Sequence, residues 1–437
     1  MKSRGKKIRF LSISILLIFS LVLTACSSKE SSSSNGGDSK GKTEIVFWHN
    51  ATDIGLTALK KMVAAFEKKH PDIKVKMVYT ESSEGADQKL LTAVAGGNPP
   101  DVALFDRFKI GSWAAKDALT DLTDMAEQDG VTEDLYYPYA WKEATYKGKL
   151  YGLPYSTDSR MLYYNKDHFK AAGLDPENPP KTIQELEAAA VKLTKKDGKR
   201  FKQIGFIPWY GQGWLYSWGW AFGGNFYDEK TGKVTANDPK IVEALDWMAK
   251  LGQKFGVEDI AGFESSAGSG AMDPFISGQL SMKVDGNWTI SAIDKYKPDM
   301  NYGVTPIPTP TGSDFTTWSG GIAIVVPKGS KHTKAAWEFT KFFGTQEGQE
   351  AYFSELPGDL SVIPAVNDKL GRSDNKMLKQ FIDILPNSHS RPVIPEGQLL
   401  WNELVDAREK TSRGNGTAKE NLDKATETVN KALEKYK

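Results

Sequence analysis

The chain has 437 residues, with 56 basic and 55 acidic side chains and one cysteine. This length is too great for one small core and suits two domains, and a single cysteine excludes an internal disulfide. The balanced charge, with no strongly basic block, argues against nucleic acid as the partner.

The first 25 residues have the pattern of a secretory signal. Five basic residues lie within the first ten, and the apolar run that follows is short for a membrane-spanning helix. The run ends in Leu23-Thr24-Ala25-Cys26, which resembles the lipobox of bacterial lipoproteins. The resemblance implies that Cys26 is lipidated and becomes the new first residue. The alternative is an ordinary cleaved signal with an incidental cysteine.

Residues 26–42 form a predicted tether. Seven serines and three glycines occur among residues 27–42, so this stretch cannot bury a core and is expected to be flexible. Without the signal, 51 basic and 55 acidic residues remain, which gives a modest negative charge. No later stretch is long and apolar enough to span a bilayer.

Strands and helices alternate after the tether. Strands are predicted over 43–49, 73–79 and 101–105, with amphipathic helices between them. This order implies a parallel sheet with right-handed crossovers, and ligands bind at the carboxyl ends of such strands. The rule selects two pairs of residues as ligand contacts: Trp48 and His49 after the first strand, and Asp106 and Arg107 after the third.

The second half repeats this alternation. Helices are predicted over 181–196 and 238–255, and strands over 279–288 and 320–330. Between them lies WYGQGWLYSWGW, residues 209–220, which holds four of the twelve tryptophans. Such a segment suits a packed core, a partner-facing patch or a wall for a flat ligand.

Several segments, taken in order, resemble a known family. IVFWHN, GGNPPDVALFD, YGLPYSTDSRMLYYNKDHF, GQLSMKVDGNW and WSGGIAIVVPKGS look like the family 1 extracellular solute-binding proteins, which serve ABC importers. The resemblance implies an α/β, two-lobe periplasmic-binding-protein-like fold. Each lobe would be a mainly parallel sheet flanked by helices, with a cleft between the lobes. The implied N-terminal lobe comprises 43–156 and 308–356, and the C-terminal lobe 157–307 and 357–437.

The resemblance also implies ligand contacts. Asp106 and Arg107 stand where the family binds sugar, Asp158 lies in the first crossover, and Trp288 and Trp401 match stacking tryptophans. Ala103 replaces a family tryptophan, which puts maltose itself in doubt. One or two tryptophans of 209–220 are expected in the cleft, with Trp209 and Trp220 favoured. The other predicted contacts are Trp48, His49, Asp285, Trp318, Gly320, Gly321 and Arg391.

These observations predict a lipid-anchored, exported, monomeric receptor that passes a sugar, in particular an oligosaccharide, to an ABC permease. No cofactor or metal is expected, because the five histidines are dispersed. Two alternatives stay open. One is an exported glycoside-processing enzyme, although no H-E-x-x-H, G-x-S-x-G or phosphate-loop motif occurs. The other is a receptor for a phosphorylated polyol, a peptide or a polyamine.

Overall fold

The computed structural model describes residues 42–81, 84–198 and 200–436. The predicted signal peptide, Cys26 and the tether as far as residue 41 lie outside the described residues. From Lys42 onward the chain forms one compact unit. Within the described ranges, no helix combines the length and apolar character needed to cross a membrane.

The first sheet has the strand order β2-β1-β3-β16-β6. β1 pairs in parallel with β2 and β3, whereas β16 is antiparallel to β3 and β6. Its strands are β1 (Thr43–His49), β2 (Ile73–Tyr79), β3 (Val102–Asp106), β6 (Leu153–Pro154) and β16 (Ile322–Val325).

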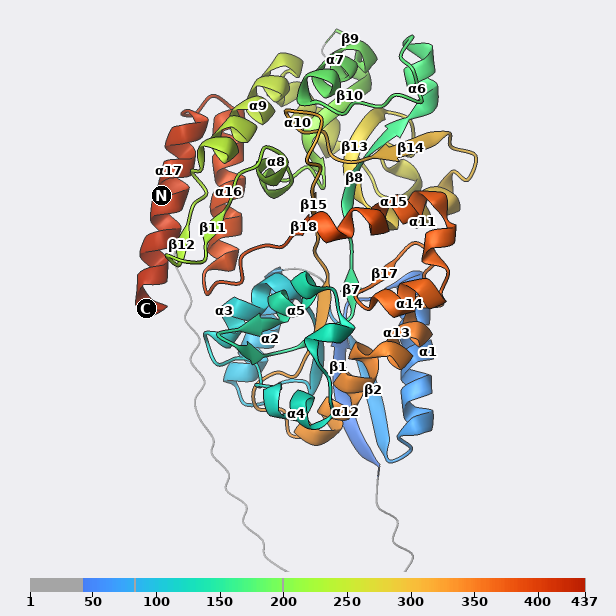
Figure 1. The fold of residues 1–437 in the computed structure, drawn as a ribbon, viewed down its shortest axis with the longest axis vertical. Helices are drawn as coiled ribbons and strands as arrows, with labels where there is room; N and C mark the ends of the chain where they lie inside the picture. Colours follow the sequence, from blue (N-terminus) through green and yellow to red (C-terminus); the bar gives the residue numbers. More distant parts are fainter. Residues whose placement is uncertain (1–41, 82–83, 199, 437) are drawn as a thin grey trace, which may run out of the picture. The chain divides into compact units, whose positions relative to one another are not determined.

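Helices surround this sheet in the lower half of Figure 1. They are α1 (Asp53–Lys69), α2 (Glu84–Ala95), α3 (Ile110–Ala114), α4 (Thr123–Gln128), α5 (Pro138–Ala144), α12 (Thr333–Gly344), α13 (Gln346–Phe353) and α14 (Pro364–Lys369), with the hairpin β4 (Thr145–Tyr146) and β5 (Lys149–Leu150). The predicted apolar face of the first helix is buried at Leu59, Val63 and Phe66. These side chains join β1 and β3 in one hydrophobic core.

The second sheet has the order β14-β8-β13-β10-β9. Its strands are β8 (Arg160–Asn165), β9 (Lys195–Asp197), β10 (Arg200–Gly211), β13 (Leu280–Gly286) and β14 (Tyr302–Thr305). β10 and β13 are parallel, and the other neighbouring pairs are antiparallel. The α/β class and the two sheets agree with the sequence, but neither sheet is mainly parallel: the first has two parallel and two antiparallel pairs, and the second has one parallel pair. In the second sheet the reason is that β8, which follows the connecting strand β7, runs antiparallel to both of its neighbours, and that β9 and β10 form a hairpin.

The remaining helices pack on this sheet, in the upper half of Figure 1. They are α6 (Lys166–Ala171), α7 (Ile183–Leu193), α8 (Leu215–Ala221), α9 (Pro239–Phe255), α10 (Val257–Ser265), α11 (Trp288–Tyr296), α15 (Lys376–Asp383), α16 (Gly397–Ser412) and α17 (Ala418–Leu433), with the hairpin β11 (Tyr227–Asp228) and β12 (Lys233–Val234). Most of them contribute to a second core, whereas α11 and α15 pack in a third hydrophobic cluster. The Asp238 carboxylate caps α9 by accepting the Lys240 N–H, and Pro239 opens the helix.

Short strands connect the two sheets. β7 (Ser156–Thr157) pairs with β17 (Leu360–Ser361), and β15 (Thr317–Trp318) pairs with β18 (Ser388–His389). Beyond β17, Val362, Ile363 and Val366 pack in the first core. These residues lie beyond the lobe boundary expected at residue 357, which stays a prediction.

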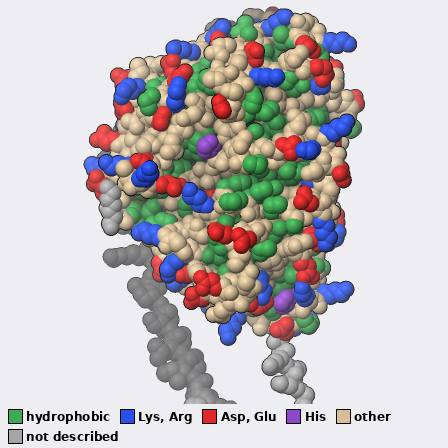
Figure 2. All heavy atoms as spheres, in the orientation of Figure 1, with side chains coloured by type: hydrophobic (Ala, Val, Ile, Leu, Met, Phe, Trp, Pro, Cys, Tyr) green, Lys and Arg blue, Asp and Glu red, His purple; other side chains and the backbone are tan. Residues whose placement is uncertain are grey.

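The surface carries mixed charge. Acidic and basic side chains are interspersed over the face drawn in Figure 2, and hydrophobic side chains gather across its middle. This face offers no block of one sign to a polyanion.

Candidate functional site

A cavity of about 730 Å³ lies between the two cores, where β3 of the first sheet and β10 of the second sheet end. We call it the cleft cavity. Its volume is within the range of small-molecule sites, and its lining mixes aromatic rings with polar groups, as such sites require. The residues that carry the argument below are Asp106, Phe108, Lys109, Asp158, Arg160, Gln212, Trp214, Trp288, Trp318, Gly320, Gly321, Asp359, Arg391, Gln398 and Trp401.

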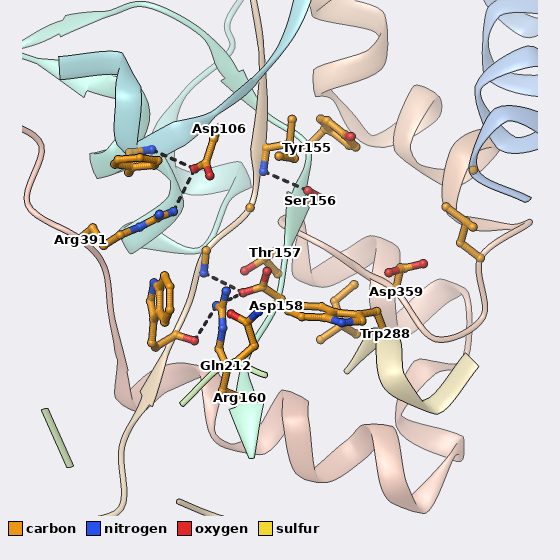
Figure 3. Close-up of a pocket in the computed structure, with 18 of the residues that line it drawn as sticks. Asp106, Tyr155, Ser156, Thr157, Asp158, Arg160, Gln212, Trp288, Asp359 and Arg391 are labelled. Atoms are coloured by element: carbon orange, nitrogen blue, oxygen red, sulfur yellow. Dashed lines mark hydrogen bonds and ion pairs between the residues drawn. The ribbon is translucent and has the colours of Figure 1, made fainter. Parts of the chain in front are cut away.

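Asp106 and Arg391 join the two sides of this cavity. Asp106 ends β3, and its Oδ1 lies 2.9 Å from Nη2 of Arg391, in the loop before α16 (Figure 3). The Asp106 carboxylate also accepts the N–H of Phe108, and the Arg391 guanidinium lies 3.9 Å from the centre of the Phe108 ring. The ion pair leaves one third of the Asp106 side chain exposed, so this carboxylate can still accept hydrogen bonds from a ligand.

Asp158 follows the connecting strand β7, and Arg160 begins β8 of the second sheet. The Asp158 carboxylate accepts the Gly320 N–H at 2.7 Å and pairs with Arg160. Arg160 also donates to the Trp318 carbonyl at 2.9 Å, and its guanidinium lies 4.1 Å from the centre of the Trp318 ring. Burial lowers the pKa of Arg160, and the Asp158 charge opposes that shift. A carboxylate is thus fixed at the cavity wall by groups from two connecting segments (Figure 3).

Two aromatic surfaces border the cavity. Trp288 begins α11, and its ring covers Gly286 so closely that a Cβ there would lie 2.1 Å from it. On the other side, the Trp401 and Trp214 rings lie 4.8 Å apart at 51°. Trp288, Trp401 and Trp214 are half-buried, so each keeps an accessible ring surface. Flat rings of this kind pack on the apolar faces of ligands.

Sequence reasoning missed several lining residues. Gln212 and Trp214 follow the carboxyl end of β10, so the strand-end rule could have selected them. Asp359 directly precedes β17 and also lines the cavity. Burial raises the pKa of the Asp359 carboxyl to about 6, although Arg372 opposes the shift. Lys109 and Gln398 gave no signal in the sequence.

Eight of the predicted contacts line the cleft cavity: Asp106, Asp158, Trp288, Trp318, Gly320, Gly321, Arg391 and Trp401. Arg107 does not, because its side chain is fully buried. Arg107 Nε donates to Glu143 at 3.0 Å, Nη2 to the Gly320 carbonyl at 2.5 Å, and Nη1 to the Ser156 carbonyl. Burial raises the pKa of Glu143, while Arg107 opposes that shift. Arg107 therefore holds the connecting segments rather than facing a ligand.

Trp48 and His49, the predicted contacts after the first strand, also lie outside the lining of the cleft cavity. Trp48 pairs in register with Ala103 and borders a separate cavity of about 110 Å³ that Asp106 shares. His49 is buried between the rings of Phe47 and Tyr79. Its position follows from the β1 alternation, which turns every second side chain into the core.

Three further predicted contacts have other partners. The Asp285 carboxylate pairs with Lys283 at 2.8 Å, within the second sheet. Trp209 is buried against Gly252, and its N–H donates to Glu264 at 3.3 Å. Trp220 borders a different cavity, described below. Within the tryptophan segment, the tryptophan that lines the cleft cavity is Trp214, which the sequence did not favour.

Comparison with known proteins identifies the family. Residues 51–350 match the family model described as bacterial extracellular solute-binding protein. The chain belongs to this family. As a solute-binding protein of an extracellular family it is exported, and its relatives are binding proteins of transporters.

Three similar proteins illustrate the range of the family. A maltooligosaccharide ABC transporter solute-binding lipoprotein of Streptococcus pneumoniae is 30% identical over 411 residues, which cover 89% of each chain. A galactooligosaccharide-binding protein of Bacillus subtilis is 28% identical, with 94% of each chain covered. The solved structure of CpMnBP1 with mannotriose bound has a TM-score of 0.80 at 29% identity, and the match covers 88% of this solute-binding protein and 99% of that chain.

Proposed function

We propose that this protein is the membrane-anchored receptor of an ABC importer and that it captures a neutral oligosaccharide in the cleft cavity. The observation that carries this proposal is the pair of aromatic surfaces, Trp288 on one side and Trp214 with Trp401 on the other, in one cavity. Two separated surfaces suit a ligand of more than one sugar ring. The relatives named for maltooligosaccharides and galactooligosaccharides support this ligand class.

The edge groups match the hydroxyls of such a ligand. Asp106 and Asp158 offer carboxylate acceptors, Lys109 offers a charged donor, and Gln212 and Gln398 offer amides. The two arginines of the cavity, Arg160 and Arg391, are each paired with an aspartate. Lys109 is likewise paired with Asp87, at 2.5 Å. These pairings favour a neutral ligand over a phosphorylated polyol, because each of the three cations that line the cavity already has a carboxylate partner.

Capture is proposed to occur by hinge closure. The N-terminal lobe would comprise 43–156 and 308–356, and the C-terminal lobe 157–307 and 357–437, except that Val362, Ile363 and Val366 pack in the first core and would move with it. β7, β15 and the segment before β17 would bend while each core moves as a rigid body. In the closed state, the Asp106 and Asp158 carboxylates would accept hydrogen bonds from ligand hydroxyls, and the two lobes would enclose the ligand. The permease would then receive this closed complex.

The anchor is proposed to be the lipid on Cys26, with the serine-rich tether between it and the compact unit. Lipidation with two or more acyl chains holds a protein stably at a membrane, whereas one chain holds it marginally. The relative from Streptococcus pneumoniae is named a lipoprotein. Replacing Cys26 by serine should release the protein from the membrane fraction in cells that otherwise retain it.

Tryptophan fluorescence titration with glucose-, mannose- and galactose-based oligosaccharides tests the proposal. We expect a saturable change with at least one of them, and recovery of that sugar unchanged. Breakdown products would instead favour the glycoside-processing enzyme, for which Asp158 and Asp359 would be the first carboxylates to replace. Response to a phosphorylated polyol alone would favour the other alternative.

A further inference from the structure

A second cavity, of about 1000 Å³, lies between the two cores. We call it the rear cavity. On one side it is lined by α5 and the β4 strand, and on the other by the β11–β12 hairpin, the 388–395 segment and the end of α17. Its volume reaches that of a substantial ligand site. The residues used below are Tyr139, Lys142, Tyr146, Trp220, Tyr227, Glu229, His389 and Tyr436.

The rear cavity and the cleft cavity lie on opposite faces of the connecting strands. Ser319 stands between Trp318 and Gly320, which both line the cleft cavity, and successive side chains of an extended segment point to opposite faces. The Ser319 hydroxyl lies 2.9 Å from the Thr157 hydroxyl, which lies 2.9 Å from the Tyr139 hydroxyl. Tyr139 lines the rear cavity. This chain of hydroxyls therefore leads through the connecting strands from one cavity to the other.

An aromatic wall separates the two cavities. Trp318 of β15 pairs in register with His389 of β18, and the Trp220 ring stacks on the His389 ring at 5.1 Å and 7°. Trp318 lines the cleft cavity, whereas Trp220 and His389 line the rear cavity. In the part of the chain that the structure describes, Arg391 is the residue shared by both linings. The rear cavity is thus a separate chamber and not an extension of the cleft.

The lining offers flat rings together with free phenol groups. Tyr146 and Tyr227 come from opposite sides of the cavity, and neither hydroxyl has a hydrogen-bond partner among the described residues. Burial and the neighbouring phenols of Tyr436, Tyr151 and Tyr227 raise the pKa of Tyr146, so this hydroxyl stays protonated. Both phenols can donate to and accept from a ligand.

Charge at this cavity is largely neutralised. Lys142 of α5 pairs with Glu229 of the β11–β12 hairpin across its mouth. Arg391 is paired with Asp106 on the cleft side. The Lys147 ammonium also lines the cavity, and it lies 5.6 Å from the centre of the Tyr146 ring. A lining of stacked rings, free hydroxyls and mostly paired charges suits a neutral molecule with apolar faces and many hydroxyl groups.

We propose that the rear cavity is a second binding site, for a neutral saccharide, formed by the Trp220–His389 stack and the phenols of Tyr146 and Tyr227. It goes beyond the proposed function, which places the transported ligand in the cleft cavity alone. A solute-binding protein with such a site takes up two saccharides per chain.

Calorimetric titration of the full-length protein in detergent, with gluco-, manno- and galactotrisaccharides as probes, tests this proposal. The cleft variant is Trp288→Ala, and the rear variant is Tyr146→Phe with Tyr227→Phe, which removes two hydroxyls but keeps both rings. We expect two saccharides per wild-type chain. Trp288→Ala should abolish the binding event in the cleft cavity. The rear variant should weaken binding in the rear cavity at least fivefold and leave binding in the cleft cavity unchanged.

Four outcomes decide the matter. A single event in the wild-type protein that the rear variant leaves intact would overturn the rear site and leave the proposed function standing. A second event that is lost in Trp288→Ala but not in the rear variant would be a further subsite of the cleft, which also overturns the proposal. If Trp288→Ala changes nothing and the rear variant removes the binding, the rear site stands and the cleft function fails. Absence of binding by all three probes overturns both.

Discussion

The Asp106 carboxylate and the Arg391 guanidinium form an ion pair at 2.9 Å that joins the first core to the loop before α16. Arg391 is nearly buried, and its guanidinium also faces the rings of Phe108 and Trp401. One arginine therefore orients the carboxylate at the end of β3 while it contacts an aromatic surface of the cleft cavity. This arrangement makes Arg391 a positioning residue for the proposed ligand.

Arg391→Met should weaken oligosaccharide binding by roughly 10- to 100-fold, since a hydrogen bond to a charged group contributes about 1.5–3 kcal/mol. The affinity of Arg391→Lys should lie between those of Arg391→Met and the wild-type protein, because lysine keeps the positive charge but lacks the planar guanidinium group. Fluorescence titration measures both. Arg413→Met is the matched control: it removes an exposed arginine that pairs with Glu258, and it should leave affinity unchanged.

Within the tryptophan segment, Trp214 lines the cleft cavity, whereas Trp209 packs in the second core. Trp214→Ala should weaken binding by about tenfold or more, because an accessible ring that packs on the ligand is lost. Trp209→Phe should lower the melting temperature and leave affinity within twofold, since Trp209 packs on Gly252 in the second core. Loss of binding in a folded Trp209→Phe protein would contradict this assignment.

The strand-end rule predicted part of this site from the sequence. It selected Asp106, and the family resemblance added Asp158, Trp288 and Trp401, all of which line the cleft cavity. The rule fails for Arg107, since it cannot tell which of two neighbouring polar residues turns toward the cavity and which turns inward to Glu143.

Other features depend on contacts between distant segments. Four tryptophans in twelve residues indicate an aromatic cluster, but the directions of their side chains depend on α8 and on the register shift of β10 between Phe206 and Gly211. The rear cavity could not be predicted at all, because α5, the β11–β12 hairpin and the 388–395 segment meet only in the folded chain. The local hydrophobic periodicity of a sequence does not predict which distant segments come into contact.

The buried Arg107–Glu143 pair should be essential to stability. Arg107→Met leaves the Glu143 carboxyl buried without its partner, and breaking a buried pair in this way costs about 3–5 kcal/mol. Urea denaturation should show that loss. Arg107→Met combined with Glu143→Leu should recover part of it, because no uncompensated charge then remains. A single variant as stable as the wild-type protein would show that the pair is not needed to hold the connecting segments.

Asp359 should make stability depend on pH. Its folded pKa of about 6 lies above the ordinary value of 3.8, so the folded state holds a proton that the unfolded chain releases. The stabilising contribution is therefore complete below pH 4 and is lost as the pH rises through 6. A shift of this size corresponds to at most about 3 kcal/mol, and water in the cleft reduces it.

Asp359→Asn removes this titration. Between pH 4 and 7 the unfolding free energy of the wild-type protein should fall relative to that of the variant, as measured by urea denaturation at each pH. Asp383→Asn is the control, since it changes an exposed carboxylate that pairs with Lys379 on α15. Parallel pH profiles for the wild-type protein and Asp359→Asn would exclude a raised pKa.

The Lys142–Glu229 pair tests whether the two cavities change width in opposite directions. Lys142 belongs to α5 and Glu229 to the β11–β12 hairpin, so the pair bridges the mouth of the rear cavity. Since the cavities lie on opposite faces of the connecting strands, a rotation about these strands that opens one closes the other. Lys142→Glu places two carboxylates across this mouth, and their repulsion should open the rear cavity and favour a closed cleft.

Oligosaccharide affinity should therefore rise by about two- to fivefold in Lys142→Glu, because an exposed pair is worth roughly 0.2–1 kcal/mol. Lys142→Glu combined with Glu229→Lys restores the attraction with reversed charges and should return the affinity to the wild-type value. High salt should diminish the difference, since both side chains are exposed. If Lys142→Glu instead weakens binding and the swap restores it, the two cavities open together, and the connecting strands are not the axis of closure.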